Sequence, residues 1–576
     1  MTQGRIMRGK IINILFCTVL SILTSDRILS QELLSVDWQN VVCTTPYISD
    51  EIYRTRTDNF GNTYVLGHFS NQANIMGETL YEKKGNYFFL KIDPSGNKVW
   101  AKCVGDTAGY TCGDFVLDSN GDIIIGINMK EHFKIEGTVV ANQPEYRNLS
   151  GAVFLKFDSD FNLKWINIFQ AKNLAYISDI AVDNEDNIYS SIPYIDSLQV
   201  GTEFYINPEI TYQSAIIKMN SNGNLIWGHQ FASDNGLVMD DLAINEGCDG
   251  CPGSVIVAGR LFGDSVFVDG ILQSSVEHIP GITLFTSTFG TSGELWGANI
   301  LDKGVQTCVD IATYNGKVYI VGRYQDEIKI GDQIITPDVS SGIFLGELNY
   351  QSNLVGFVDL KMYSSTNVTS LNISPEYGFV VSGNFGHIYT VGDIIITLPD
   401  SGDRGSFITS FNENFALNNC KYIGGGVYGL RTLSISGEDI SGGAILEGNC
   451  SFANATCSAF VSDISTFKTT DLNKVSQFNP ENMPIYIDET KRTYNVYPNP
   501  FYQDFYVKFN DPVSNTNVRL VNTVGQIIEG QIAHPVSDKK VLVDASTLPA
   551  GVYYLYISSC SNFEARTKII KKGERQ

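Results

Sequence analysis

A stretch that ends in tryptophan returns about every sixty residues along this chain, and no other feature constrains the fold as strongly. Self-similarity at a fixed period marks a repeat architecture, because one unit alone cannot bury its apolar face. The stretches read FFLKIDPSGNKVWAK at 88–102, VFLKFDSDFNLKWIN at 153–167, AIIKMNSNGNLIWGH at 215–229 and TLFTSTFGTSGELWG at 283–297. Their tryptophans are Trp100, Trp165, Trp227 and Trp296, with gaps of 65, 62 and 69 residues.

A second signature precedes each tryptophan stretch: a short apolar strand, a turn rich in Asn, Asp and Gly, and another strand with aromatic or β-branched residues. Period-two alternation bounded by such turn residues predicts a two-stranded hairpin. Each unit then holds four strands, and seven units describe a β-propeller with seven blades. The copies are RTRTDNFGNTYVLG at 54–67, GDFVLDSNGDIIIG at 113–126, SDIAVDNEDNIYSS at 178–191, DLAINEGCDGCPGSVIVAG at 241–259, VDIATYNGKVYIVG at 309–322, SLNISPEYGFVVSG at 370–383 and LSISGEDISGGAIL at 433–446.

A longer segment lies between the second and third strands of a unit and carries the pattern apolar-Gly-x-x-apolar. We count it as part of each unit. It reads IMGETL at 75–80, IEGTVV at 135–140, VDGILQ at 268–273, IGDQII at 330–335 and VGDIII at 391–396.

The two ends of the repeat region complement each other. VDWQNVV at 36–42 is a tryptophan strand with no FLKxD strand before it, whereas SAFVSDIS at 458–465 has no tryptophan strand after it. Pairing these ends would complete the seventh blade and remove exposed edges. Trp38, the four later tryptophans and two degenerate positions, Gly356 and Asn419, then supply one residue for each blade. The predicted fold is all-β, a seven-bladed β-propeller closed by its N-terminal strand.

The three motifs of the unit together resemble the seven-bladed β-propeller repeats (SBBP-like repeats) of secreted bacterial proteins. The resemblance covers about residues 36–465. It implies the fold, and it implies no activity, because proteins of many roles carry such repeats.

The first thirty residues predict a signal peptide, because a basic start is followed by a nearly unbroken apolar run over 11–23. Thirteen residues are too few for a comfortable membrane span, and we expect no transmembrane anchor later in the chain. The predicted domains are therefore 1–30 for the signal peptide, 31–465 for the propeller, 466–493 for a polar linker and 494–576 for a C-terminal domain.

The C-terminal domain alternates apolar and polar residues in five or more short segments, which predicts a small immunoglobulin-like β-sandwich. Its distinctive residues are Tyr497, Pro498, Asn499 and Pro500, the turn at Gly525 and Gln526, the run from Leu548 to Tyr553 with Gly551, and the basic tail from Lys568 to Lys572. With these residues it resembles the type A sorting domain of the type IX secretion system (T9SS) of Bacteroidetes. The resemblance implies transport through the outer membrane by the secretion machinery and removal of the domain by a sortase-like protease, leaving a cell-surface or released product.

The body of the chain is acidic. Residues 31–490 carry 25 basic and 54 acidic side chains, a net charge of −29, whereas residues 491–576 carry 11 and 7, a net charge of +4. An acidic body repels nucleic acid and anionic membranes and favours solubility.

Three close cysteine pairs could close small loops as disulfides in an oxidising compartment. The CxxC at 248–251 could instead be a redox dithiol or half of a zinc site, although no second CxxC or histidine pair accompanies it. The pairs are Cys103 with Cys112, Cys248 with Cys251, and Cys450 with Cys457.

No catalytic residues, cofactor or metal site are predicted. The turns at 118–122 and 183–187 gather oxygens as a calcium loop would, but tight hairpins require the same residues. The repeated tryptophans are also found in quinone-dependent dehydrogenase propellers, yet here we expect them to act as packing anchors in outer strands. No GxSxG, HExxH or phosphate-binding glycine loop has a suitable context.

The sequence thus favours an exported, non-catalytic binding or adhesion protein with a polysaccharide or protein ligand on a propeller face. The alternative is an extracellular hydrolase or lyase that acts on polysaccharides in the propeller channel. A structural coat protein is a third reading. Which ligand is bound does not follow from the sequence.

Overall fold

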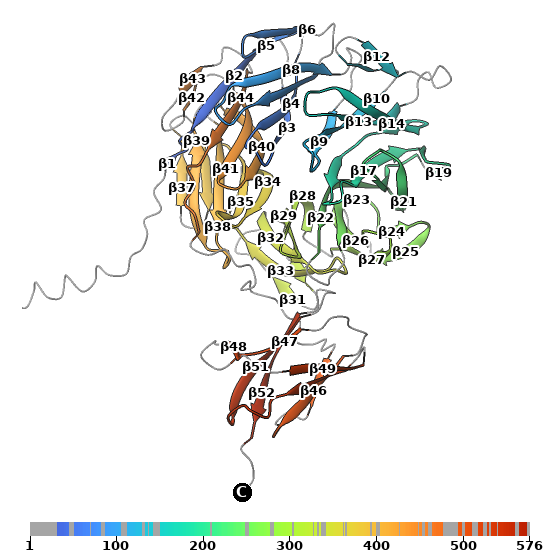
Figure 1. Ribbon diagram of the computed structural model, residues 1–576, viewed down its shortest axis with the longest axis vertical. Coiled ribbons are helices and arrows are strands. Elements are labelled where there is room, and N and C mark those ends of the chain that lie inside the picture. The colour runs from blue at the N-terminus through green and yellow to red at the C-terminus, as the bar shows by residue number, and fades with distance from the viewer. Residues whose placement is uncertain are drawn as a thin grey trace, which may run out of the picture.

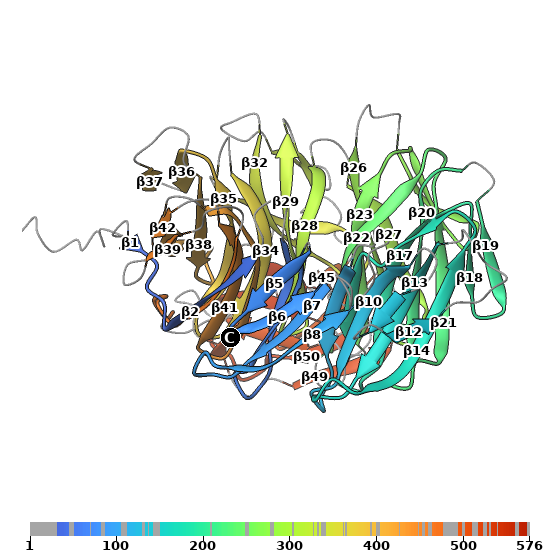
Figure 2. The ribbon, with the colours of Figure 1, turned by 90° about the horizontal axis from the view of Figure 1, so that it is seen from above.

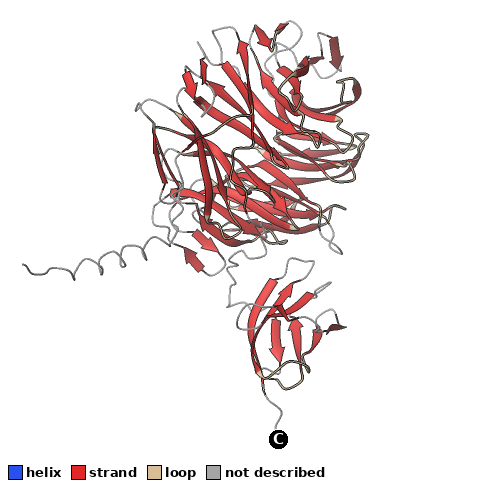
Figure 3. Cartoon of the chain, turned by 60° about the vertical axis from the view of Figure 1, so that its left-hand side comes forward, coloured by secondary structure: helices blue, strands red, loops and turns tan. Residues whose placement is uncertain are grey.

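The computed structural model describes residues 32–475 and 494–572 apart from short segments within each span, of which 105–111, 142–149 and 510–516 are the longest. All regular elements among the described residues are strands (Figure 3). The larger part is a propeller, in which sheets stand side by side around a central axis (Figures 1 and 2). The smaller part holds the strands after residue 493.

Six sheets of the propeller each come from one continuous stretch of chain, as short Asn/Asp/Gly turns between neighbouring strands require. The first contains β3 (Glu51–Thr57), β4 (Thr63–His68), β7 (Tyr87–Ile92) and β8 (Lys98–Val104). The second contains β9 (Cys112–Leu117), β10 (Ile123–Met129), β13 (Ser150–Phe157) and β14 (Leu163–Ala171). The third contains β15 (Leu174–Ala175), β16 (Asp179–Val182), β17 (Ile188–Ile195), β20 (Gln213–Met219) and β21 (Leu225–Ala232).

The other three of these sheets follow in chain order around the axis. The fourth contains β22 (Leu237–Asn245), β23 (Ser254–Leu261), β26 (Thr283–Gly290) and β27 (Leu295–Ile300). The fifth contains β28 (Val305–Tyr314), β29 (Lys317–Gln325), β32 (Ser341–Leu348) and β33 (Leu354–Asp359). The sixth contains β34 (Asn367–Ser374), β35 (Gly378–Phe385), β38 (Gly405–Phe411) and β39 (Leu417–Ile423), with β1 (Glu32–Leu33) parallel to β39.

A further sheet joins the two ends of the repeat region, as the sequence predicted. Its strands are β40 (Val427–Ser436), β41 (Asp439–Leu446), β44 (Asp463–Thr469) and β2 (Trp38–Thr44), in that order. Trp38 faces Lys468, so the pairing strand extends four residues beyond the predicted end at 465. The stretch after 465 reads as polar, but Thr466 and Phe467 are fully buried and Lys468 reaches Asp439 at 2.7 Å. A β-branched hydroxyl and a paired amine are therefore accommodated inside the sheet.

Strand register tests the predicted tryptophan position. Lysines 91, 156, 218 and 468 of the third strands face Trp100, Trp165, Trp227 and Trp38 respectively. Gly356 and Asn419 occupy the same position in β33 and β39, as predicted. In β27, Gly297 occupies this position, and Trp296 lies at the adjacent shift in strand register. The prediction for Trp296 is wrong by one residue, because the turn at 290–294 places Gly297, not Trp296, opposite Thr288.

The segments with the apolar-Gly-x-x-apolar pattern form hairpins, and three of them, at 75–80, 135–140 and 268–273, leave their own sheet and add to the outer edge of the preceding one. For example, β24 (Ser265–Val268) belongs by sequence to the fourth sheet but pairs with β21 of the third, and Asp269 in its turn lies 2.6 Å from His229 Nδ1 on β21. The hairpin of β24 is completed by β25 (Ile271–Ser275). Three other hairpins attach in the same way: β5 (Gln72–Ile75) with β6 (Glu78–Tyr81) pairs with β2, and β11 (Phe133–Ile135) with β12 (Thr138–Ala141) pairs with β8. The third, β18 (Ser197–Val200) with β19 (Glu203–Ile206), pairs with β14. The pairs β30 (Ile328–Ile330) with β31 (Gln333–Ile335), β36 (Ile388–Val391) with β37 (Ile394–Thr397) and β42 (Asn449–Ser451) with β43 (Thr456–Ser458) form separate two-stranded sheets.

The C-terminal part consists of two four-stranded sheets around one core that includes Phe505, Leu520, Val543 and Ile569. One sheet contains β45 (Tyr494–Tyr497), β46 (Asp504–Phe509), β50 (Lys540–Asp544) and β49 (Ile532–Ser537). The other contains β48 (Ile527–Ile528), β47 (Asn517–Val521), β51 (Gly551–Ser558) and β52 (Glu564–Lys571).

The propeller core lies between neighbouring sheets, and the tryptophans do more than pack there. The indole N–H of Trp165 donates to the carbonyl oxygen of Ser221 in the next sheet at 3.1 Å. Trp100 and Trp227 make the equivalent bonds to Ser159 and Thr291. Trp296 instead donates to Glu294 of its own sheet. Three of these tryptophans therefore tie one sheet to the next by a hydrogen bond as well as by apolar contact.

This difference predicts unequal effects of one substitution. We expect Trp165→Phe to lower the free energy of unfolding by about 1 kcal/mol more than Trp296→Phe, because only the former removes a bond between sheets. Chemical denaturation of both variants beside the wild type measures this. Equal losses would show that the indole N–H of Trp165 contributes nothing to the contact between sheets.

Candidate functional site

One position on the innermost strands surrounds the channel. These strands are interrupted by a bulge-like shift in register, for instance between Met239 and Asp241 in β22 and between Cys308 and Asp310 in β28. The residue that follows the shift in five sheets, and the residue at the matching repeat position in β9 and β16, we call the ring position. Its residues are Arg54, Asp114, Asp179, Asp241, Asp310, Ser370 and Thr432.

Carboxyl groups at the ring position bind the backbone of the next sheet. Asp179 Oδ2 accepts the N–H of Leu242 at 3.0 Å, and Asp241 Oδ2 accepts that of Ile311 at 2.6 Å. Asp310 Oδ2 accepts the N–H of Leu371 at 2.6 Å. A bulge leaves a backbone N–H without a partner in its own ladder, and a buried N–H requires an acceptor. The row of aspartates therefore satisfies the irregularities of successive inner strands.

Two arginines on β3 join one end of this row. Arg54 Nε lies 3.0 Å from Asp114 Oδ1, and Arg56 Nη2 lies 3.2 Å from Asp114 Oδ2. Arg54 Nη2 also approaches Asp179 at 3.9 Å. Asp114 is fully buried, whereas each arginine side chain keeps 33% of its surface exposed. Asp114 is thus enclosed in the wall, and the guanidinium groups remain accessible from the channel.

Burial and charge push the pKa values of the row apart. Burial acts to raise the pKa of Asp114, but the charges of Arg56 and Arg54 outweigh it and lower that pKa. Burial, followed by the charge of Asp114, raises the pKa of Asp179 to about 8. Burial and the charges of Asp179 and Asp310 raise the pKa of Asp241 well above its ordinary value, and burial raises that of Asp310. A lowered pKa at Asp114 beside raised pKa values at Asp179 and Asp241 suits neighbouring carboxyls that share hydrogen bonds with one another.

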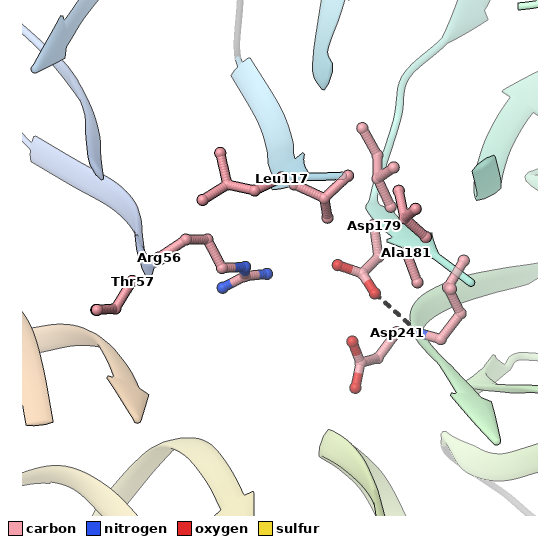
Figure 4. A pocket seen from close by; sticks show the side chains of 10 residues that line it. Arg56, Thr57, Leu117, Asp179, Ala181 and Asp241 are labelled. Atoms are coloured by element: carbon pink, nitrogen blue, oxygen red, sulfur yellow. Dashed lines mark hydrogen bonds between the residues drawn. The ribbon is translucent and has the colours of Figure 1, made fainter. Parts of the chain in front are cut away.

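A cavity of about 350 Å³ opens beside the row (Figure 4). Figure 4 shows the guanidinium of Arg56 extending toward the carboxyls of Asp179 and Asp241 from the opposite side. Val116, Ile180, Ala181 and Leu242 supply apolar lining. A larger cavity of about 560 Å³ lies at the outer edge between the second and third sheets, but no charged side chain lines it. The channel cavity is therefore the candidate functional site.

The sorting-motif residues predicted from the sequence lie in the C-terminal part. Tyr497 ends β45, Gly551 begins β51, and the buried Tyr553 donates its hydroxyl to the carbonyl of Pro549 at 2.7 Å. The backbone of Phe501 bonds to Ile570 and Lys572, so the chain just after the Tyr-Pro-Asn-Pro motif lies beside the basic tail. Pro498, Asn499, Pro500, Gly525 and Gln526 lie outside the described residues.

Lys571, in the basic tail, is buried. Its Nζ donates to the carbonyls of Ala545 and Ser546, at 2.7 Å each. Lys571 therefore fixes the loop that precedes β51.

The predicted cysteine pairs fall in different surroundings. Cys103 is buried in β8 and Cys112 begins β9 of the next sheet. Cys450 and Cys457 face each other directly in the hairpin of β42 and β43. Cys248 and Cys251 lie outside the described residues.

The turns considered for calcium make the hydrogen bonds that a tight hairpin requires. Asp118 Oδ1 accepts the N–H groups of Asn120 and Asp122, both at 2.9 Å, and Asp118 Oδ2 lies 2.6 Å from Lys156 Nζ. Asp183 makes the same pair of backbone bonds in the next sheet. In the part of the chain that is described, no three His, Cys, Asp or Glu side chains are grouped to hold a metal.

Comparison with known proteins identifies the C-terminal part. Residues 495–572 match the family described as "Secretion system C-terminal sorting domain". The protein is secreted. The sorting domain indicates export by the type IX machinery, and the described residues include no helix that could span a membrane.

No curated protein matches the chain. A crystal structure of the extracellular domain of a one component system from B. thetaiotaomicron aligns over 93% of this chain and 98% of its own length. It is 8% identical with a TM-score of 0.14, which carries no argument about fold or function.

Sequence reading missed the ring position, although a signal was present. The aspartates at 114, 179, 241 and 310 stand at one offset within the aligned repeats, four residues before the first turn residue. The structure adds that these four residues come together in one row beside Arg54 and Arg56.

The row predicts opposite pH effects for two matched substitutions. The raised pKa of Asp179 means that its contribution to stability is full below about pH 4 and is lost as the pH rises toward 8. The lowered pKa of Asp114 means that its contribution is full above about pH 4 and is lost as the pH falls through that pKa. Relative to wild type, Asp179→Asn should gain about 1 kcal/mol or more in free energy of unfolding as the pH rises through this range.

Asp114→Asn should show the reverse trend, with its largest loss at neutral pH and a smaller one in acid. Urea unfolding at about pH 3, 5, 7 and 9 separates the two variants. Parallel pH profiles would contradict the opposite pKa shifts of the two carboxyls.

Proposed function

We propose that this secreted protein is a non-catalytic binding or adhesion module, held on the cell surface or released, whose ligand enters the propeller channel. The sorting domain supports the address, and a propeller commonly binds ligands at its axis or on its loop-bearing faces. Polysaccharides and proteins are the partners that such an extracellular address favours.

One observation carries the non-catalytic assignment: the ring carboxyls serve the contacts between sheets. Asp179, Asp241 and Asp310 each accept a backbone N–H from the next sheet. Glycoside hydrolysis needs two carboxyls about 5–5.5 Å apart for retention, or about 6.5–9.5 Å apart for inversion. Neighbouring carboxyls of this row are instead close enough to share hydrogen bonds. Their arrangement therefore favours a structural role over acid–base catalysis.

A hydrolase or lyase acting on polysaccharides is the second candidate. The observation in its favour is the contrast between Asp114, with a lowered pKa, and Asp179, with a raised one. Carboxyls whose pKa values are pushed apart are typical of acid–base pairs.

Several finer assignments belong to the same proposal. The composite sheet of β40, β41, β44 and β2 has the same strand order as the other six propeller sheets, which supports a seventh blade and SBBP-like repeats. Two sheets around one core support an immunoglobulin-like sandwich in the sorting domain. The proposal also includes a signal peptide at 1–30 and domain boundaries near 31, 465 and 494. It further includes removal of the sorting domain by a sortase-like protease and an origin in Bacteroidetes.

The proposal includes a disulfide between Cys450 and Cys457. Directly opposed residues of antiparallel strands have Cα atoms about 4.5–5.5 Å apart, within the range that a disulfide spans. We expect peptide mapping of the exported protein without reductant to recover these two cysteines in one linked peptide. Recovery of both as free thiols, with linkage appearing at another pair, would refute this assignment.

The functional proposal predicts binding without turnover. The full exported chain should retain at least one cell-wall, algal or host polymer in a panel assayed together for binding and for release of reducing ends. Release of reducing ends by the wild type that is lost in Asp179→Asn would establish the enzyme alternative instead. Failure to bind any polymer or partner protein would remove the proposal.

A further inference from the structure

The larger cavity, of about 560 Å³, lies where a hairpin separates from the sheet to which it is attached. The hairpin of β18 and β19 pairs with β14 only at Ala171 and Leu198. Beyond this pair it packs against β21 of the third sheet, where a Cβ added to Gly228 would meet the hydroxyl of Tyr205 at 3.0 Å. A space therefore opens between β14, the hairpin and the turn that precedes β21.

The part of β14 beside this space carries backbone groups that the hairpin does not reach. The Lys172 N–H donates to the carbonyl of Ser197 in β18 at 3.1 Å. Successive residues of a strand direct their backbone groups to opposite sides, and no register shift interrupts this part of β14. Ile166 and Ile168 therefore direct theirs to the same side as Lys172, and among the described residues β18 pairs with neither.

Side-chain amides converge on the same space, which we call the amide groove. Among the described residues, three of these amides make no hydrogen bond within the protein, those of Gln170, Asn222 and Asn224. Each amide offers both donors and an acceptor, so the groove presents hydrogen-bonding groups without charge. Its amide lining consists of Asn167, Gln170, Gln199, Asn222 and Asn224.

The turn that supplies Asn222 and Asn224 differs from its counterpart in the second sheet. There, the amide of Asn162 donates to the carboxylate of Asp158 at 2.9 Å. The corresponding residue at the amide groove is Asn220, whose Oδ1 accepts the backbone N–H groups of Asn222 and Asn224 at 3.0 Å each. Asn220 therefore closes the turn without a carboxylate. The groove stays uncharged, and the amide of Asn224 remains available.

We propose that the amide groove binds a neutral saccharide, at a site separate from the channel. A sugar hydroxyl both donates and accepts hydrogen bonds, as an amide does, and a groove without charged side chains matches a ligand that bears none. Phe204 lies directly opposite Gln199 in the hairpin, so the two side chains share a face, and Phe204 is 62% exposed. Its ring can contact the apolar C–H face of a sugar beside the amides. The volume of the groove is typical of small-molecule sites.

An extended peptide that adds a strand to β14 is the other ligand such an edge could take. Strand addition depends on main-chain hydrogen bonds along the edge. Only Ile166 and Ile168 offer free backbone groups in the described part of this edge, which is short beside the five or six residues of a usual strand. A peptide bound through its main chain would also leave the side-chain amides unused. The saccharide is therefore favoured.

Titration calorimetry on the full exported chain tests the proposal with cellotriose, mannotriose and xylotriose as neutral probes and trigalacturonate as a charged one. We expect at least one neutral trisaccharide to bind. Asn222→Ala removes an exposed amide that makes no bond within the described protein, and it should lower the affinity about five- to tenfold. Gln199→Ala should have a similar effect.

Gln273→Ala is the matched control and should leave binding unchanged. Gln199 and Gln273 each donate to a backbone carbonyl two residues away at 3.2 Å, but Gln273 lies on β25 and does not line the groove. Asn220→Asp tests the site without removing a side chain. It supplies the carboxylate that holds the amide of Asn162 in the second sheet, so it should engage Asn224 and lower the affinity while preserving the turn.

Saccharide affinity that is unchanged in Asn222→Ala, Gln199→Ala and Asn220→Asp would place the ligand elsewhere. It would overturn this proposal and leave the proposed function standing. Tighter binding of trigalacturonate than of every neutral probe would also overturn it, as would binding of the extended peptide acetyl-(Thr-Val)₃-amide in place of all saccharides. If no neutral probe binds, the amide groove is not a saccharide site, and the polymer and partner panel alone decides the proposed function.

Discussion

A single kind of hydrogen bond holds the inner wall of this propeller together: a side-chain oxygen at the ring position accepts a backbone N–H from the neighbouring sheet. Aspartate is the acceptor in several sheets. Where the two ends of the repeat region meet, the Thr432 hydroxyl accepts the N–H of Thr55. Because the inner strands are irregular at this point, the N–H groups have no partner within their own sheet. The chemistry of the channel follows from this constraint, since it places carboxyls side by side and forces them to share protons.

The outer wall uses another device for the same purpose. Trp165 and Lys156 both donate to the carbonyl of Ser221, which lies in a turn of the next sheet. The buried ammonium of Lys156 is compensated by Asp118 in its own sheet. The third and fourth sheets show both devices: Asp179 accepts the N–H of Leu242 near the axis, and Trp227 and Lys218 donate to the carbonyl of Thr291 near the periphery.

The repeat fold could be predicted from the sequence because the turn residues and the tryptophan position recur at nearly constant spacing. Pairing of Trp38 with the end of the repeat region was also predictable, since each end lacks what the other supplies. The true end of the last strand was missed because Thr466 and Lys468 look solvent-exposed until their partners are known. The attachment of the outer hairpins to the preceding sheet has no local signal at all. Likewise, the row of aspartates is visible in aligned repeats, but only the arrangement in space shows that Arg54 and Arg56 complete it.

Closure of the composite sheet has a consequence for how the molecule matures. Val41 pairs with Ser465, so almost the entire propeller must be present before that contact can form. Bringing together residues so distant along the chain carries a loop-closure entropy cost, and contacts of this kind are slow to form. Until then, β2 and β44 expose unpaired edges that invite association with other chains. The propeller can therefore close only once the chain is available as far as Ser465, shortly before the sorting domain begins.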